Sequence, residues 1–224
     1  GLDSLLLMSQ AGMRGGDAVV KVLNGEVTPS GKLTDTWAVN YEDYSSSEGF
    51  GANDGNVTQE EYTDDIYVGY RYFDTFNVTP AYEFGYGLSY TDFNIDVKDV
   101  TVDEENVTVD VRVTNVGEKY SGKEVVEVYF SAPDGALEKP YQELAAYGKT
   151  DTLAPGESQE LTLSYATTEM SSYSQDLAAY VMENGDYVVR VGNSSRNTSV
   201  EAVINLDSNK VTEQLSNQMV QDEE

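Results

Sequence analysis

The stretch NVTVDVRVTNV, residues 106–116, alternates strictly between apolar and polar side chains. One side of the alternation carries Val107, Val109, Val111 and Val113, and the other carries Thr108, Asp110, Arg112 and Thr114. A period of two is typical of a strand with one buried face and one solvated face. The stretch therefore predicts a strand of an antiparallel sheet, because strands of a parallel sheet are buried on both faces.

Four more strand-like runs follow this stretch. They are EVVEVYFSAP (124–133), SQELTLSY (158–165), GDYVVRVGNS (185–194) and SVEAVINL (199–206). Glycine- and proline-containing turn signals separate them, for example at Pro133-Asp-Gly135 and Asn184-Gly185. Short strands at this spacing indicate an antiparallel β-sandwich, which we place at residues 92–207. Residues 208–224 have weak helical spacing and an acidic end, and we expect a linker or tail there.

The residues before the sandwich show a different organisation. SLLLMSQ at 4–10 is apolar without alternation, which predicts a short buried strand. DAVVKVLNGE at 17–26 predicts a helix, with Asp17 as its N-cap and Asn24-Gly25 as its stop. Strand, glycine loop and helix form the unit of an α/β layer, so residues 1–91 are assigned to an α/β part. The chain opens on a strand-like run, and we expect it to be a piece of a longer protein.

The composition limits the chemistry. Thirteen basic and forty acidic residues give a net charge of −27, which disfavours nucleic acid and anionic membranes as partners. A generally acidic proteome would explain the same charge without any functional role. The chain has no cysteine and no histidine, which excludes disulfides, thiolate metal sites and a Ser-His-Asp triad. Any acid–base chemistry would have to use carboxylates, tyrosine or lysine.

The stretch EFGYGLSYTDF, residues 83–93, is rich in aromatic residues and lies where the α/β part meets the sandwich. Gly85 and Gly87 permit close backbone approach, and tyrosine suits a boundary because it has an apolar body and a polar end. We predict a packing seam between the two parts that includes Tyr86 and Tyr90. Sugar binding by these tyrosines or Tyr82 is the alternative.

YVGYRYFD at 67–74 is predicted to support the same seam. We expect Arg71 to be at least half-buried there and paired with a carboxylate such as Asp74.

Three separated segments occur in an order that resembles glycoside hydrolase family 3, the β-glucosidase family: GGDAVVKVLNGEVTPSGKLTDTW, IYVGYRYFDT and YEFGYGLSYTDF. VTNVG, GKEVVEVYFSAP, KPYQELAAYGKT, LAPGESQEL and NGDYVVRVGNSS resemble the fibronectin type III-like domain of that family. The resemblance covers about residues 4–207. It implies the end of an (α/β)₆ sandwich domain followed by an all-β fibronectin type III-like sandwich.

The resemblance implies a retaining β-glucosidase that hydrolyses terminal non-reducing β-D-glucosyl residues with two carboxylates and no cofactor. The family's nucleophile lies in a barrel domain, and its acid/base glutamate lies upstream of the segment matching GGDAVVKVLNGE. Neither is carried onto this chain, so no catalytic and no metal-binding residue is assigned. The expected partners are the barrel, the upstream (α/β)₆ portion and a β-glucoside or cello-oligosaccharide. A homo-oligomer and the compartment, bacterial cytoplasmic or secreted, stay open.

The tail, KVTEQLSNQMVQDEE, resembles the start of a connection found in family members whose barrel follows the sandwich. We expect that reversed order here, and the usual order is the alternative.

Residues 40–61 are polar and glycine-rich and predict a long loop, which in compact domains is often functional. Within SSSEGFG, Phe50 is a candidate for stacking on a sugar, and Glu48 for accepting its hydroxyl groups. A plain solvated loop is the alternative, and NDGN at 53–56 lacks the spacing of a full calcium loop.

A different class of function also has to be considered, namely a non-catalytic carbohydrate-binding or subunit-interaction module. Exposed aromatic residues in a row on one sandwich face would favour it. The alternating strands instead carry mostly Thr, Asp, Glu and Arg on their polar side.

Overall fold

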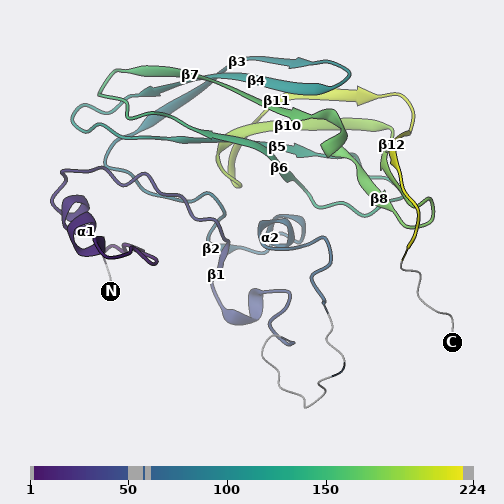
Figure 1. Cartoon of the computed structure of the whole chain (residues 1–224), viewed down its shortest axis with the longest axis horizontal. Coiled ribbons are helices and arrows are strands. Elements are labelled where there is room, and N and C mark those ends of the chain that lie inside the picture. Colours follow the sequence, from purple (N-terminus) through teal and green to yellow (C-terminus); the bar gives the residue numbers. More distant parts are fainter. Residues whose placement is uncertain (1–2, 50–57, 59–61, 219–224) are drawn as a thin grey trace.

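A computed structural model describes residues 3–49, 58 and 62–218 (Figure 1). The N-terminal part contains short elements joined by long connections. They are α1 (Gly15–Leu23), β1 (Trp37–Ala38), the 3₁₀ helix η1 (Tyr41–Asp43), α2 (Tyr70–Thr75) and β2 (Pro80–Tyr82). β1 and β2 pair with each other as a two-stranded antiparallel sheet. None of the described helices is long and apolar enough to cross a membrane.

Two antiparallel sheets form the sandwich that the sequence predicts. The first has the order β3-β4-β7, with β3 (Phe93–Val102), β4 (Asn106–Asn115) and β7 (Ser158–Ala166). The second has the order β11-β10-β5-β6, with β5 (Val125–Ser131), β6 (Glu143–Lys149), β10 (Gly185–Ser194) and β11 (Asn197–Leu206). The predicted fold class, an antiparallel sandwich after a partial α/β region, is therefore confirmed.

A third, smaller sheet closes one end of the sandwich. Its order is β12-β9-β8, with β8 (Ser172–Ser174), β9 (Ala179–Met182) and β12 (Lys210–Gln214), and the 3₁₀ helix η2 (Thr167–Met170) precedes it. The prediction that residues 208–224 form only a linker or tail is wrong for 210–214. These residues pair antiparallel with β9, from Lys210 opposite Met182 to Gln214 opposite Ala179. Residues 210–214 form a strand because β9 has an edge that β8 does not occupy, and the backbone there bonds to them.

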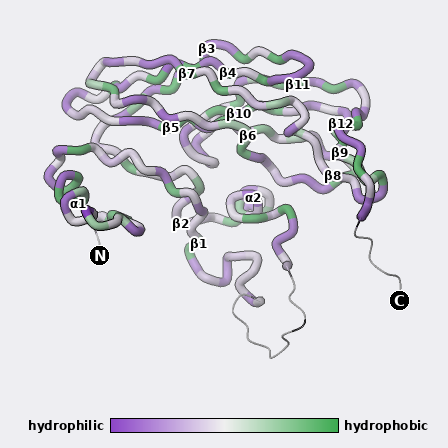
Figure 2. The backbone as a smooth tube through the Cα atoms, in the orientation of Figure 1, coloured by the Kyte–Doolittle hydropathy of each residue, from purple (hydrophilic) through white to green (hydrophobic). Residues whose placement is uncertain are grey.

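The core lies between the two large sheets. The valines of the alternating stretch in β4, namely Val107, Val109, Val111 and Val113, are all buried in it. Val126 and Val128 of β5 and Val189 of β10 meet them from the other sheet. Figure 2 shows hydrophobic and hydrophilic positions interspersed along the strands. The period of two in the sequence is thus the period of burial.

β5 is buried on both faces, unlike the other strands of the sandwich. Val126, Val128 and Phe130 point into the core, while Glu127 and Tyr129 point to the opposite face and are buried as well. The N-terminal part lies on that opposite face (Figure 1). Glu127 and Tyr129 are therefore buried between β5 and the N-terminal part (Figure 1).

Two expectations for the N-terminal part are wrong. Residues 4–10 form no strand, and Leu5, Leu6 and Leu7 are exposed. A strand requires a neighbour to bond with, and no described segment pairs with this one. Helix α1 is present, but Asp17 is not its N-cap. Asp17 lies in the first turn and accepts two hydrogen bonds from the guanidinium of Arg14, the residue at the N-cap position.

Candidate functional site at the seam

The seam is the contact surface between residues 28–33 and 70–90 of the N-terminal part and β5, β6 and residues 193–196 of the sandwich. At its centre, the Tyr129 hydroxyl donates a 2.7 Å hydrogen bond to Glu127 Oε2. The ring of Tyr70, the first residue of α2, lies against Tyr129 and Phe84, with ring centroids 5.9 and 5.0 Å away. The contact with Tyr129 is edge-to-face and that with Phe84 is tilted, and both geometries are favourable for aromatic pairs.

Gly85 lets the chain approach β5 closely enough to cover Glu127. It has a φ of +82°, and a Cβ there would lie 2.6 Å from Glu127 Oε2 and 2.7 Å from Ser194 Cα. Only glycine adopts this backbone conformation readily and leaves this space free. The backbone on either side is tied down, because Gly85 N donates to Leu33 O at 2.8 Å and Ser195 N donates to Phe84 O at 2.9 Å.

The buried charges of the seam are mostly carboxylates. Glu127 is only 4% exposed, and burial raises the pKa of its carboxyl. Glu124 and Glu83 also raise it, whereas the bond from Tyr129 and the nearby ammonium of Lys32 lower it. Lys32 lies 3.0 Å from Glu124 Oε1, and both side chains are largely buried. Glu124 thus has a lysine in direct contact, whereas Glu127 has a direct hydrogen bond from Tyr129 and feels the Lys32 ammonium only at longer range.

α2 is held to the sandwich through its C-terminal end. Arg196, from the turn between β10 and β11, donates from Nε to Asp74 Oδ1 at 2.8 Å. Its Nη2 donates to the backbone oxygens of Phe73 at 2.9 Å and Val78 at 2.7 Å. Gln142 Nε2 donates to the second oxygen of Asp74 at 3.0 Å. Burial nevertheless raises the Asp74 pKa, because desolvation outweighs these favourable contacts.

Arg71 is partly buried and pairs with a carboxylate, as expected, but the carboxylate is Glu143 and not the suggested Asp74. Arg71 Nε lies 3.1 Å from Glu143 Oε1 on β6, while Asp74 is bound by Arg196. The two α2 side chains therefore reach different elements of the sandwich. Next to this ion pair, Leu144 N donates to the Tyr70 hydroxyl at 2.8 Å.

Tyr86 and Tyr90, the two tyrosines expected in the seam, have different partners: those of Tyr86 lie within the N-terminal part. The Tyr86 carbonyl accepts a 2.8 Å hydrogen bond from Leu33 N, and its ring centroid lies 4.9 Å from that of Tyr82. The Tyr90 hydroxyl donates to Val22 O in α1 at 2.9 Å. Its ring lies 5.7 Å from that of Tyr120, which follows β4. Tyr90 thus links α1 to the sandwich.

The two substrate-side candidates are placed differently. Glu48 is exposed in the turns that follow η1, where Ser47 N donates to Tyr44 O at 3.0 Å. Phe50 lies outside the described residues, as do the NDGN stretch and Glu60 and Glu61. Asp64, another acid near this loop, accepts a hydrogen bond from Ser45. Within the described ranges, no group of three or more Asp and Glu side chains could hold a metal ion.

Four residues of the seam have no role that the sequence predicts: Lys32, Glu127, Gln142 and Arg196. For Glu127 a signal exists, since EVVEVYF places apolar residues at successive positions around it. Such a run indicates a strand buried on both faces. The other three lie in loops, and their partners are distant in the sequence.

Four carboxylates of the seam make contacts that hold parts of the chain together. A retaining glycosidase needs two carboxyl groups about 5–5.5 Å apart on either side of a substrate. Glu127, Glu124, Asp74 and Glu143 are instead each engaged by a tyrosine, lysine or arginine inside a contact between two parts of the chain.

Comparison with known proteins agrees with this architecture. Residues 1–90 match the family model of the glycosyl hydrolase family 3 C-terminal domain, and residues 124–195 match that of a fibronectin type III-like domain. Beta-glucosidase A from Butyrivibrio fibrisolvens is 42% identical over 98% of this chain and 29% of the relative. A beta-glucosidase from Ruminococcus albus is 40% identical over 95% of this chain and 22% of the relative.

Solved structures show the same likeness. Beta-glucosidase 3B from Thermotoga neapolitana, in complex with glucose, has a TM-score of 0.86 and 43% identity over 92% of this chain and 28% of that chain. A beta-glucosidase from Paenibacillus barengoltzii has a TM-score of 0.85 and 44% identity over 91% of this chain and 23% of that chain. The chain therefore spans less than a third of the length of these relatives.

The arrangement is that of a region of a glycoside hydrolase. More specifically, the chain belongs to glycoside hydrolase family 3, with the family's C-terminal domain sequence followed by its fibronectin type III-like domain.

Proposed function

We propose that this chain is part of a retaining β-glucosidase that releases glucose from the non-reducing ends of β-glucosides or cello-oligosaccharides. The observation that carries the proposal is the 42% identity to a protein named beta-glucosidase A, over 98% of this chain but only 29% of the relative. The catalytic carboxylates then belong to the portion of the enzyme outside these residues. The chain supplies structural support, and its seam fixes the N-terminal part to the sandwich.

The partner of the N-terminal part is the remainder of the (α/β)₆ domain and the barrel of the same protein. The support is a group of exposed apolar side chains on residues 5–8 and α1: Leu5, Leu6, Leu7, Met8, Val20 and Leu23. Side chains of this kind are normally covered, and contiguous exposed apolar surface marks an interaction site. A neighbouring strand beside residues 4–10 would also satisfy the backbone groups that have no strand partner here.

Glu48 and Phe50 are proposed to border the outer part of the substrate site. Glu48 is exposed in the turns after η1 and is therefore free to meet a ligand. The two side chains would strengthen the binding of longer substrates and would take no part in bond cleavage.

The experiment is hydrolysis of an aryl β-glucoside, first by this chain alone and then by the chain joined to the missing portion. We expect no turnover alone and turnover in the joined protein. In the joined protein, Glu48→Gln should raise KM for cello-oligosaccharides more than for the aryl glucoside, with kcat little changed. Turnover by the chain alone that disappears in Glu48→Gln, or in Glu61→Gln at another acid of the loop 40–61, would overturn this division of roles.

A further inference from the structure

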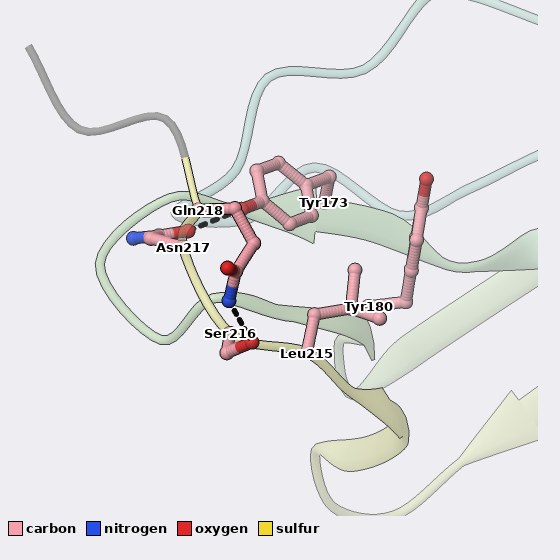
Figure 3. Close-up of a pocket in the computed structure, with 6 residues that line it drawn as sticks. All are labelled: Tyr173, Tyr180, Leu215, Ser216, Asn217 and Gln218. Atoms are coloured by element: carbon pink, nitrogen blue, oxygen red, sulfur yellow. Dashed lines mark hydrogen bonds between the residues drawn. The ribbon is translucent and has the colours of Figure 1, made fainter.

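Two tyrosines of the small sheet form an exposed aromatic pair at one end of the sandwich (Figure 3). Tyr173 on β8 and Tyr180 on β9 lie directly opposite each other in the antiparallel register. Their neighbours Ser174, Ala179 and Val181 are buried, so the alternation along each strand turns both rings outward. The rings are 5.5 Å apart between centroids, and the residues are 41% and 40% exposed.

A hollow of about 370 Å³ lies beside this pair. The two rings line it together with Leu215, Ser216, Asn217 and Gln218 from the segment after β12. A second hollow of about 420 Å³ is also lined by Tyr180, so this side chain is the common wall between the two. We call this pair of hollows the tyrosine groove. It offers aromatic surface flanked on both sides by polar groups.

One ring is held in place and the other keeps a free polar end. The Tyr173 hydroxyl donates to Asn217 Oδ1 at 2.9 Å, which fixes the ring against the C-terminal segment (Figure 3). Across the described part of the chain, the Tyr180 hydroxyl has no hydrogen-bond partner, and it stays available to a ligand. Gln218 Nε2 donates to Ser216 Oγ at 2.7 Å, so the Gln218 amide oxygen is still free to accept.

The charge around the groove restricts its ligand. Neither hollow is lined by a lysine or arginine, and the second contains Glu169 and Glu213. The chain as a whole carries −27, so an anionic ligand is repelled. A cationic ligand would suit the two glutamates, but the hollow lined by both rings contains no charged side chain. A neutral molecule with apolar faces and many hydroxyl groups fits both hollows.

We propose that the tyrosine groove binds a neutral glucosyl chain. The tyrosine rings would contact the C–H faces of the sugar, and the Asn217, Gln218 and Glu213 side chains would bond to its hydroxyl groups. The groove lies at the end of the sandwich opposite α1, away from the turns after η1 (Figure 1). The choice of glucose rests on the proposed function, whereas the choice of a neutral sugar rests on the groove itself.

The test is isothermal titration of the full chain with cellohexaose. Binding should weaken at least about tenfold in Tyr180→Ala, which removes the shared wall. Tyr147→Ala is the matched control, because Tyr147 is a 71% exposed tyrosine on β6 that lines neither hollow. Tyr173→Phe keeps the ring and loses only the hydrogen bond to Asn217, so it should retain most of the affinity. Thermal unfolding of each variant shows whether the fold is kept.

Three outcomes of the sugar titrations would overturn the proposal. They are no binding of cellohexaose by the unaltered chain, equal weakening in Tyr180→Ala and Tyr147→Ala, and binding of xylohexaose in place of cellohexaose. Loss of self-association in Tyr180→Ala without any sugar binding would also overturn it and make the groove a contact between two copies of the chain. Hydrolysis by the joined enzyme is measured separately, so failure of this site and failure of the proposed β-glucosidase activity give different results.

Discussion

Arg196 and Asp74 are 122 residues apart in the sequence, yet Arg196 Nε lies 2.8 Å from Asp74 Oδ1 across the seam. The Asp74 side chain is only 5% exposed, whereas that of Arg196 is 30% exposed. The same guanidinium also binds the backbone oxygens of Phe73 and Val78. One side chain from the β10–β11 turn thus compensates a buried carboxylate and the C-terminal end of α2 together.

Replacing Arg196 with alanine should lower the free energy of unfolding by about 2–3 kcal/mol, because it leaves a buried carboxylate without its cation. Urea unfolding of the chain measures the change. The matched control is Arg112→Ala, which removes an exposed pair with Glu160 and should cost about 0–1 kcal/mol. If both variants lose the same free energy of unfolding, the Arg196–Asp74 contact contributes no more to stability than an exposed ion pair.

Gly85→Ala should destabilise the seam by roughly 2–5 kcal/mol, because it adds a strained φ to a steric clash. The glutamate side chain could move aside, but the Ser194 Cα that a Cβ would meet at 2.7 Å is backbone.

Gly156→Ala separates the backbone strain from the steric clash in the stability loss expected for Gly85→Ala. Gly156 has a similar φ of +79° with no atom within 4 Å of the added Cβ, so only the strain of about 1–2 kcal/mol should remain. Thermal unfolding of both variants measures the difference, and a Gly85→Ala protein no less stable than Gly156→Ala would contradict the close packing described here.

The sequence was sufficient for the strands with regular alternation, and insufficient for those without it. β4, β5, β7, β10 and β11 were predicted within a few residues of their bounds. β3 was missed as a separate strand because its alternation breaks at Lys98-Asp99, where the structure has an irregularity in its register with β4. β6, with the sequence ELAAYGK, has no β-branched residue to indicate a strand.

The seam shows a second limit of sequence reasoning. A packing role for Tyr86 and Tyr90 at this boundary could be proposed because aromatic residues gather between two differently patterned segments. Partners could not be assigned, because Arg71 has an acid three residues away and yet pairs with Glu143, on a strand that only the fold brings near. The burial of Glu127 depends likewise on which element covers the outer face of β5.

Glu127→Gln should flatten the dependence of stability on pH. Burial raises the folded-state pKa of Glu127 above its ordinary value of 4.5. The contribution of this group is therefore fully present below about 4.5 and is lost as the pH rises through the raised folded-state value. Urea midpoints measured from pH 4.5 to 8 should fall less steeply in the variant than in the unaltered chain.

The remaining slope in that variant is attributed to the Asp74 and Glu143 carboxyls, whose pKa values burial also raises. The amide that replaces the Glu127 carboxyl can still accept the hydrogen bond from Tyr129, so the packing is retained. A variant with an unchanged slope would show that Glu127 titrates as an ordinary exposed glutamate.

Tyr90→Phe should loosen α1 while leaving the sandwich intact. The change removes only the hydroxyl that donates to Val22 O, and the ring contact with Tyr120 remains. A single hydrogen bond of this kind contributes about 0.5–1.5 kcal/mol, and Tyr90 is partly exposed, so the lower end applies. Amide hydrogen exchange should therefore accelerate in α1 and stay unchanged in β4 and β10, since opening of one segment need not unfold the rest. The control is Tyr147→Phe, on the exposed side of β6. If exchange in α1 accelerates equally in both variants, or in neither, Tyr90 does not hold the helix to the sandwich.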